Sequence, residues 1–215
     1  MGSPVSSAPM SDERAGPRSS VEALWLETLG VLCNRVAHEL KGALNGVVVN
    51  VEVVRSRTAK PDVAAASVRQ YAQSASAQLE AVIAMSDAML SLARPARQPL
   101  NLGQAVRNIE ALVGAAVRAD EKRLELEGMI DALGSTSADA DVARLVVASA
   151  FIAAVDASPD VVCSAVPAAE GASLCWQCRG GEAVPSIDSA VLSLAASEGI
   201  DVQRDGSTLS ITFPR

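Results

Sequence analysis

Two long runs of the sequence carry the apolar spacing of packed helices, and they constrain the fold more than any other feature. In residues 21–57, apolar side chains recur in alternating steps of three and four, the spacing of a helix-packing seam. A second run with this spacing occupies residues 62–93, after a short break that contains Pro61. Two helices joined by so short a turn are predicted to form an antiparallel hairpin. The seam positions are Leu26, Leu29, Cys33, Val36, Leu40, Ala43, Val47 and Val54 in the first run, and Val68, Tyr71, Ala75, Gln78, Val82, Met85, Met89 and Leu92 in the second.

The hairpin carries more apolar residues than these two seams use. One hairpin would leave the additional residues in water, whereas two hairpins packed as a four-helix bundle would bury them. We therefore expect a homodimer. The additional apolar residues are Val48, Val51, Leu79, Ile83 and Leu90.

The rest of the chain divides by composition and pattern. Residues 1–19 are rich in Ser, Pro, Gly and charge and are predicted to be a disordered leader, with Ser19 or Ser20 capping the first helix. Residues 20–94 form the hairpin, and the proline-containing residues 95–99 form a hinge. Residues 100–215 are expected to form a small α/β sandwich with a mostly antiparallel sheet and helices on one face. Its helices are predicted at 102–119, 139–157 and 186–197, and its strands at 123–127, 161–166, 174–178, 200–204 and 209–213.

Composition excludes several classes of function. The net charge is -7, there is no basic cluster, and the two Trp, one Tyr and two Phe are too few for a stacking platform, so nucleic acid is not an expected partner. No apolar run approaches the roughly 18 to 20 residues that span a bilayer, and we expect a cytoplasmic protein that does not bind membranes. Cys175 and Cys178 have the spacing of a redox or zinc motif. On a strand, however, residues three apart point to opposite faces, which argues against a paired thiol site.

His38 is the only histidine. If Leu26 occupies position a of the heptad, His38 falls at position f, the position farthest from the seam, and its ring should be exposed. An exposed imidazole is mostly neutral at pH 7 and presents a nucleophilic nitrogen that can accept a phosphoryl group. An ordinary surface histidine is the alternative reading of the position alone.

The residues around His38 favour the functional reading. This stretch resembles the phosphoacceptor box of the histidine kinase dimerisation domain, and the matching residues are His38, Glu39, Leu40, Lys41, Leu44 and Asn45. The resemblance implies that His38 carries the phosphoryl group and that Glu39 orients the ring or takes its proton. Because Lys41, Gly42, Leu44 and Asn45 lie on or beside the face of His38 within two helical turns, we expect them to contact a receiver domain and not the bundle core.

Two positions depart from this pattern. Gly42 stands where the family usually has Asn or Thr, which positions a water for dephosphorylating the partner, so a phosphatase role is not expected. Ala43 stands where the family usually has Pro, and the helix should therefore run straighter here.

The second half resembles the ATP-binding domain of histidine kinases in its order of elements but not in its chemistry. The similar stretches are residues 99–102, 144–159 and 199–214. Ala153 stands where the family has its magnesium-binding Asn, and an alanine side chain cannot bind a metal. The adenine-reading Asp is missing after Cys178, and only residues 183–186 remain where the family has a long lid. We expect no nucleotide, cofactor or metal to be bound by this chain.

A phosphoacceptor helix beside a lost nucleotide site predicts a dimeric histidine phosphotransferase that relays phosphoryl groups between response-regulator receiver domains. Magnesium is then expected on the partner receiver. Two alternatives stay open: a pseudokinase scaffold that binds a kinase or regulator without carrying phosphate, and a kinase with an unorthodox nucleotide site.

Overall fold

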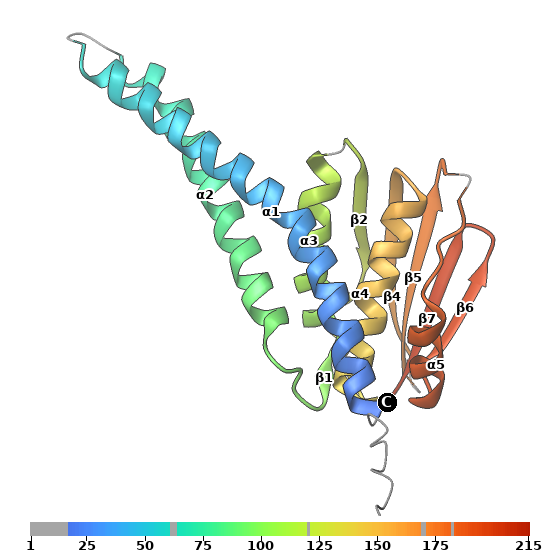
Figure 1. The fold of residues 1–215 in the computed structure, drawn as a ribbon. Coiled ribbons are helices and arrows are strands. Elements are labelled where there is room, and N and C mark those ends of the chain that lie inside the picture. Colours follow the sequence, from blue (N-terminus) through green and yellow to red (C-terminus); the bar gives the residue numbers. More distant parts are fainter. Residues whose placement is uncertain (1–16, 61–63, 120, 169–170, 182) are drawn as a thin grey trace, which may run out of the picture.

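A helical hairpin projects from an α/β unit in the computed structural model (Figure 1), which describes residues 17–60, 64–119, 121–168, 171–181 and 183–215. The hairpin consists of α1 (Pro17–Thr58) and α2 (Ala66–Ala93), which run side by side for most of their length. The first helix begins at Pro17, not after a cap at Ser19 or Ser20, because proline is well suited to a first helical position, where no intrahelical N–H bond is needed. The predicted start of the second helix at Asp62, and residues 1–16 of the expected leader, lie outside the described residues.

The predicted seam needs one correction, in the first half of α1. Leu26 is 67% exposed, whereas Trp25 and Leu32 are buried. This half of α1 packs against α3 and α4 of the α/β unit as well as against α2, so its buried face is turned away from the two-helix seam. In α2, the predicted positions Met85 and Leu92 are buried.

The α/β unit is built on a five-stranded sheet with strand order β2-β4-β5-β7-β6. β2 and β4 are parallel and the other neighbours are antiparallel, which confirms the predicted mostly antiparallel sheet. A separate pair, β1 with β3, and a short 3-10 turn were not predicted, because segments this short carry no readable periodicity. The elements are β1 (Leu100–Asn101), α3 (Leu102–Ala119), β2 (Arg123–Gly128), η1 (Ile130–Ala132), β3 (Ser135–Thr136), α4 (Ala140–Ala157), β4 (Asp160–Ala168), β5 (Gly171–Arg179), α5 (Ser189–Ser197), β6 (Asp201–Asp205) and β7 (Thr208–Pro214).

Helices cover one face of this sheet. Along β5, residues 172, 174, 176 and 178 are buried and the alternate residues are more exposed, as expected for a strand with one covered face. Trp176 meets Phe151 of α4 edge to face, with ring centroids 5.3 Å apart, and this contact ties α4 to the sheet. Cys178 is buried and Cys175 is partly exposed, which confirms that the two thiols point to opposite faces.

One apolar core joins the hairpin to the α/β unit. It includes Trp25 and Leu32 from α1 and Leu92 from α2, together with residues of α3, α4 and the sheet. The connecting residues 95–99 lie against the start of α4, where the Ala96 N–H donates to Asp141 Oδ1 at 3.4 Å. These residues connect α2 to β1, and their role as a hinge stays a prediction.

Candidate functional site

His38 lies on α1 at the point where the hairpin leaves the α/β unit. Val36 is the last buried residue of α1 in sequence order, and the helix continues to Thr58 beyond the α/β unit (Figure 1). The His38 side chain is exposed, as its heptad position predicts. The ring is thus presented to solvent, with a rigid helix on one side and the α/β unit next to it.

A cavity of about 300 Å³ adjoins His38. Three parts of the chain meet there, because the ends of α3 and α4 approach the middle of α1. An ion pair crosses the gap, with Arg35 Nη2 2.8 Å from Asp156 Oδ2, and joins α1 to the end of α4. The lining residues are Asn34, Arg35, His38 and Glu39 of α1, Ala116 and Val117 of α3, Lys122 of the following turn, and Val155 and Asp156 of α4.

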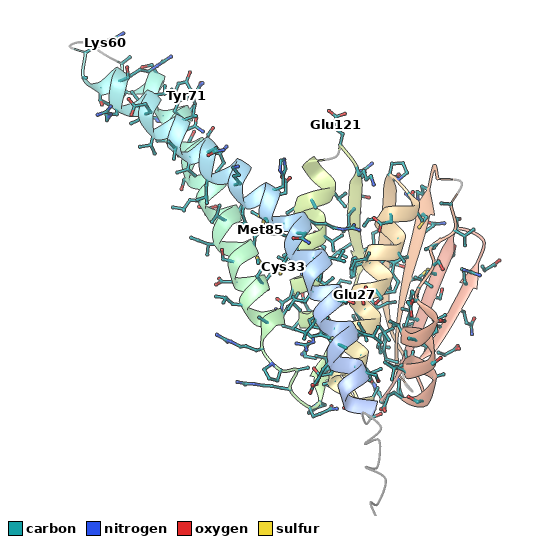
Figure 2. The ribbon with its side chains drawn as sticks, viewed as in Figure 1. Glu27, Cys33, Lys60, Tyr71, Met85 and Glu121 are labelled. Atoms are coloured by element: carbon teal, nitrogen blue, oxygen red, sulfur yellow. The ribbon has the colours of Figure 1, made fainter. Side chains whose placement is uncertain are left out.

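The turn after α3 carries Lys122 into this cavity. Glu121 has a φ of 58°, a left-handed conformation that costs a non-glycine residue roughly 1 kcal/mol. The Lys122 N–H then donates to the carbonyl of Val117 at 2.9 Å, which closes the end of the helix. Figure 2 shows Glu121 at the apex of this turn, between α3 and β2. The side chain of Lys122 turns back and donates from Nζ to the carbonyl of Val155 at 3.2 Å.

The other predicted site residues differ in their exposure and in their position around the axis of α1. Glu39 is partly exposed and lines the cavity. Lys41, Gly42 and Asn45 are exposed, and helix geometry places them within about 60° of His38 around the axis of α1. Leu44 is exposed but lies about 120° away, so it does not share the His38 face. The roles assigned to these residues remain predictions.

A second cavity, of about 450 Å³, lies farther along the same side of α1. It occupies the space between α1, α4 and the segment that leads into α5, and Ala153 of α4 is part of its lining. The charged side chains that line it are Glu27, Asp156 and Asp188, all acidic. Glu27 lies on α1 beside α4 in Figure 2. Such a lining repels a polyphosphate.

An exposed apolar stripe runs along the hairpin. Its members are between 47% and 67% exposed, although each is a large aliphatic residue. Their spacing of three, four and seven residues places those of each helix on one face. The stripe consists of Leu44, Val48 and Val51 of α1 and Leu79, Ile83 and Leu90 of α2.

Several residues that line the cavity beside His38 were not predicted from the sequence. Arg35 could have been, because it precedes His38 by one helical turn and therefore shares its face. Lys122 and Asp156 could not, because they are distant in sequence and reach the cavity only through the packing of α3 and α4 on α1. Among the described residues, no group of three or more His, Cys, Asp or Glu could hold a metal ion.

Comparisons with known proteins assign no family. No family model and no curated protein matches the chain. One solved structure that matches is the Acinetobacter baumannii histidine kinase AdeS, with 14% identity over 82% of this chain and 97% of that chain, at a TM-score of 0.33. A TM-score this low supports no conclusion about this chain. Within the described ranges, no helix has both the length and the apolar character needed to cross a bilayer.

Proposed function

We propose that this chain is a dimeric histidine phosphotransferase that relays phosphoryl groups between receiver domains through His38. The observation that carries the proposal is the exposed imidazole of the only histidine, followed by Glu39, on a long helix beside a cavity lined by basic and acidic side chains. The sequence around His38 is similar to a phosphoacceptor box, in which the histidine ring must be accessible to accept a phosphoryl group.

The transfer needs little from the protein beyond a presented nucleophile. The lone pair of a His38 ring nitrogen attacks the phosphorus of an aspartyl phosphate on the donor receiver. A P–N bond forms, the P–O bond to the aspartate breaks, and the carboxylate leaves with the electron pair. The same step in reverse passes the group to the aspartate of a second receiver. Magnesium held by the receiver stabilises the charge on the transferring group, and Glu39 orients the ring or takes its proton.

The second cavity supports phosphate coming from another protein and not from ATP. Its acidic lining disfavours a triphosphate, and the residue at the family's metal position is Ala153.

The exposed stripe supports the dimer. A row of aliphatic side chains on both helices would stay in water in a single copy, and packing against the same row of a second copy would bury it. The His38 face points in another direction around α1, so dimerisation leaves it accessible.

The direct test is transfer of radiolabelled phosphate from a phosphorylated receiver domain to the full chain, with a panel of receivers as donors. We expect an acid-labile, alkali-stable label on the native chain and none on His38→Ala, which should fold normally because the side chain is exposed. A label that persists in His38→Ala, or no label from any donor, contradicts the proposal. In that case binding of a kinase or regulator without transfer would favour the pseudokinase scaffold.

Calorimetry with ATP and magnesium tests the remaining alternative. We expect no binding tighter than millimolar, because the cavity beside Ala153 is lined by carboxylates. A tighter affinity would favour a kinase with an unorthodox nucleotide site.

A further inference from the structure

Lys122 and Glu39 are the charged residues of the His38 cavity that form no ion pair among the described residues, and Lys122 is the cation of the two. Arg35 is bound to Asp156, so these two charges compensate each other. Lys122 donates to the main-chain oxygen of Val155, and in the described part of the chain it has no carboxylate partner at ion-pair distance. The cavity therefore contains an ammonium group that a main-chain oxygen holds in place, and none of the described carboxylates is ion-paired with it.

The end of α4 fixes the position of this ammonium group. Val155 belongs to the last turn of α4, where unpaired carbonyl groups give the helix end a partial negative charge. A lysine that binds such a carbonyl is held there by both the hydrogen bond and the helix dipole. The left-handed residue Glu121 directs the chain so that Lys122 can reach this carbonyl. Two local features thus hold the ammonium group at the cavity that His38 also lines.

A phosphoryl group on His38 would supply negative charge and acceptor oxygens to the cations of this cavity. It carries close to two negative charges and three strong acceptor oxygens, and it binds best to charged N–H donors. The cavity has room for such a group at about 300 Å³. It offers the ammonium of Lys122 and the N–H groups of Arg35 that the single bond to Asp156 leaves free.

We propose that the cavity is a phosphoryl-binding site built by both parts of the chain, in which Lys122 neutralises the phosphoryl group carried by His38. Arg35 is its second donor. This inference rests on the proposed function, because it takes His38 as the phosphoryl carrier. It assigns the α/β unit a direct part in the chemistry, through a side chain more than 80 residues from His38 in the sequence.

Phosphoramidate, a small anionic phosphoryl donor, tests this site without any receiver domain. The ring nitrogen of His38 attacks phosphorus, a new P–N bond forms, the P–N bond of phosphoramidate breaks, and ammonia leaves with that electron pair. The rate of phosphohistidine formation on the full chain is followed by ³¹P NMR. Because the donor is an anion, a neutralising ammonium group should speed its reaction, and added salt should weaken this effect.

Two variants of Lys122 distinguish the loss of its charge from a change in the structure of the cavity. We expect Lys122→Gln to slow phosphohistidine formation by about threefold or more at low salt, with a weaker dependence on salt, because a unit positive charge is lost from the cavity that His38 also lines. The same variant should raise the second pKa of the phosphoryl group in a ³¹P titration, because a nearby cation favours the dianion. Lys122→Arg keeps the charge and should stay close to the native chain in both measurements.

Lys60→Gln is the matched control. It removes the same charge at the tip of the hairpin, beyond the end of α1 and about 30 Å from His38 along the helix (Figure 2). It should leave both the rate and its salt dependence unchanged. Equal slowing by Lys60→Gln would show an effect of net charge and would overturn the proposal.

The result that overturns the inference alone is a Lys122→Gln chain that forms phosphohistidine at the native rate with the native titration. The proposed relay would then still stand, since it is tested by transfer from receivers. A native chain that takes phosphate from phosphoramidate but from no receiver contradicts the relay instead. In that case the effect of Lys122→Gln still decides whether the cavity binds a phosphoryl group.

Discussion

Arg144 is the residue that ties the most separate parts of the molecule together. Its guanidinium donates to the carbonyls of Leu92 at 3.1 Å and Arg94 at 2.6 Å, at the end of α2, and to Asp141 Oδ1 at 2.7 Å. It also stacks 4.0 Å from the ring centroid of Trp25 on α1. Burial lowers the pKa of this guanidinium, and Asp141 acts in the opposite direction. A side chain from α4 thus caps the last carbonyls of α2 and holds α1 in place.

We expect Arg144→Met to lower the free energy of unfolding by about 2 to 4 kcal/mol, because the carbonyls of Leu92 and Arg94 lose their donor and the ion pair with the partly exposed Asp141 is broken. Arg144→Lys should also destabilise, since one ammonium group cannot reach three acceptors in the plane of a guanidinium. Urea unfolding followed by circular dichroism measures both. Arg107→Met removes an exposed arginine that pairs with Asp131 and should show no comparable loss. Equal losses for the two positions would contradict the role assigned to Arg144.

At the scale of single elements, the glycines of α1 show which parts of the helix are in contact. A Cβ added at Gly30 or Gly42 would meet nothing within 4 Å, whereas at Gly46 it would overlap the amide of Gln78 on α2. That amide accepts a hydrogen bond from Asn50 Nδ2 at 3.2 Å. Gln78, the one polar member of the predicted seam, therefore belongs to a polar contact between the helices, and Gly46 makes room for it.

We expect Gly42→Ala to raise the free energy of unfolding by about 0.5 to 1 kcal/mol, the usual gain of alanine over glycine inside a helix. Gly46→Ala should gain less or destabilise, because the new methyl group displaces the Gln78 amide. Urea unfolding of the two variants side by side checks the difference, and a larger gain at Gly46 would contradict it. If Gly42 lies against a docked receiver, Gly42→Ala should also slow phosphoryl transfer while it stabilises the chain.

The exposed apolar stripe predicts that the chain assembles as a dimer. We expect the native chain to sediment as a dimer and Val48→Glu or Ile83→Glu to sediment as a monomer, because each variant places a carboxylate in the buried centre of the bundle. Met129→Glu is the matched control, because Met129 is 63% exposed but lies outside the stripe. A native monomer, or a dimer unaffected by both stripe variants, would show that the stripe serves another contact.

The sequence predicts the longer elements well because each of them has a strong local pattern. The helices predicted at 102–119 and 139–157 agree with α3 and α4 to within one residue, and the strand predicted at 123–127 agrees with β2 to within one residue. The predicted strands at 161–166 and 174–178 are shorter than β4 and β5, because pairing between these two strands continues beyond the apolar run of each. The start of α5 was placed too early, at Ser186, whereas Asp188 caps the helix with its side chain on the Ala190 N–H.

The candidate site, too, could be predicted from the sequence only in part. The exposure of His38 agrees with the predicted seam at Val36, which is buried and lies about 160° from His38 around α1. The error at Leu26 and the missed Lys122 have one cause: both depend on how α1 lies against α3 and α4, and no local spacing encodes that packing.

For the whole molecule, the shared core makes the hairpin and the α/β unit a single cooperative structure. Leu32 of α1 is 1% exposed and belongs to the same apolar cluster as Trp176 in the sheet. Most helical residues lie in α1 and α2, so circular dichroism at 222 nm mainly reports the hairpin. In a Trp25→Phe chain, fluorescence reports Trp176 alone, since the chain has two tryptophans. The fluorescence signal therefore follows the α/β unit, whereas the dichroism signal follows both parts, with the larger share from the hairpin.

We expect these two signals to give one urea midpoint in the Trp25→Phe chain, as in a two-state transition. Adding Leu32→Ala should lower the free energy of unfolding by about 2 to 5 kcal/mol and shift both midpoints together, because a cavity on α1 weakens the core that also holds Trp176. If residues 95–99 instead joined two independent units, Leu32→Ala would shift the dichroism midpoint and leave the fluorescence of Trp176 unchanged. Such a split would also remove the reason for Lys122 to stay beside His38, since the cavity exists only while α3 and α4 are packed on α1.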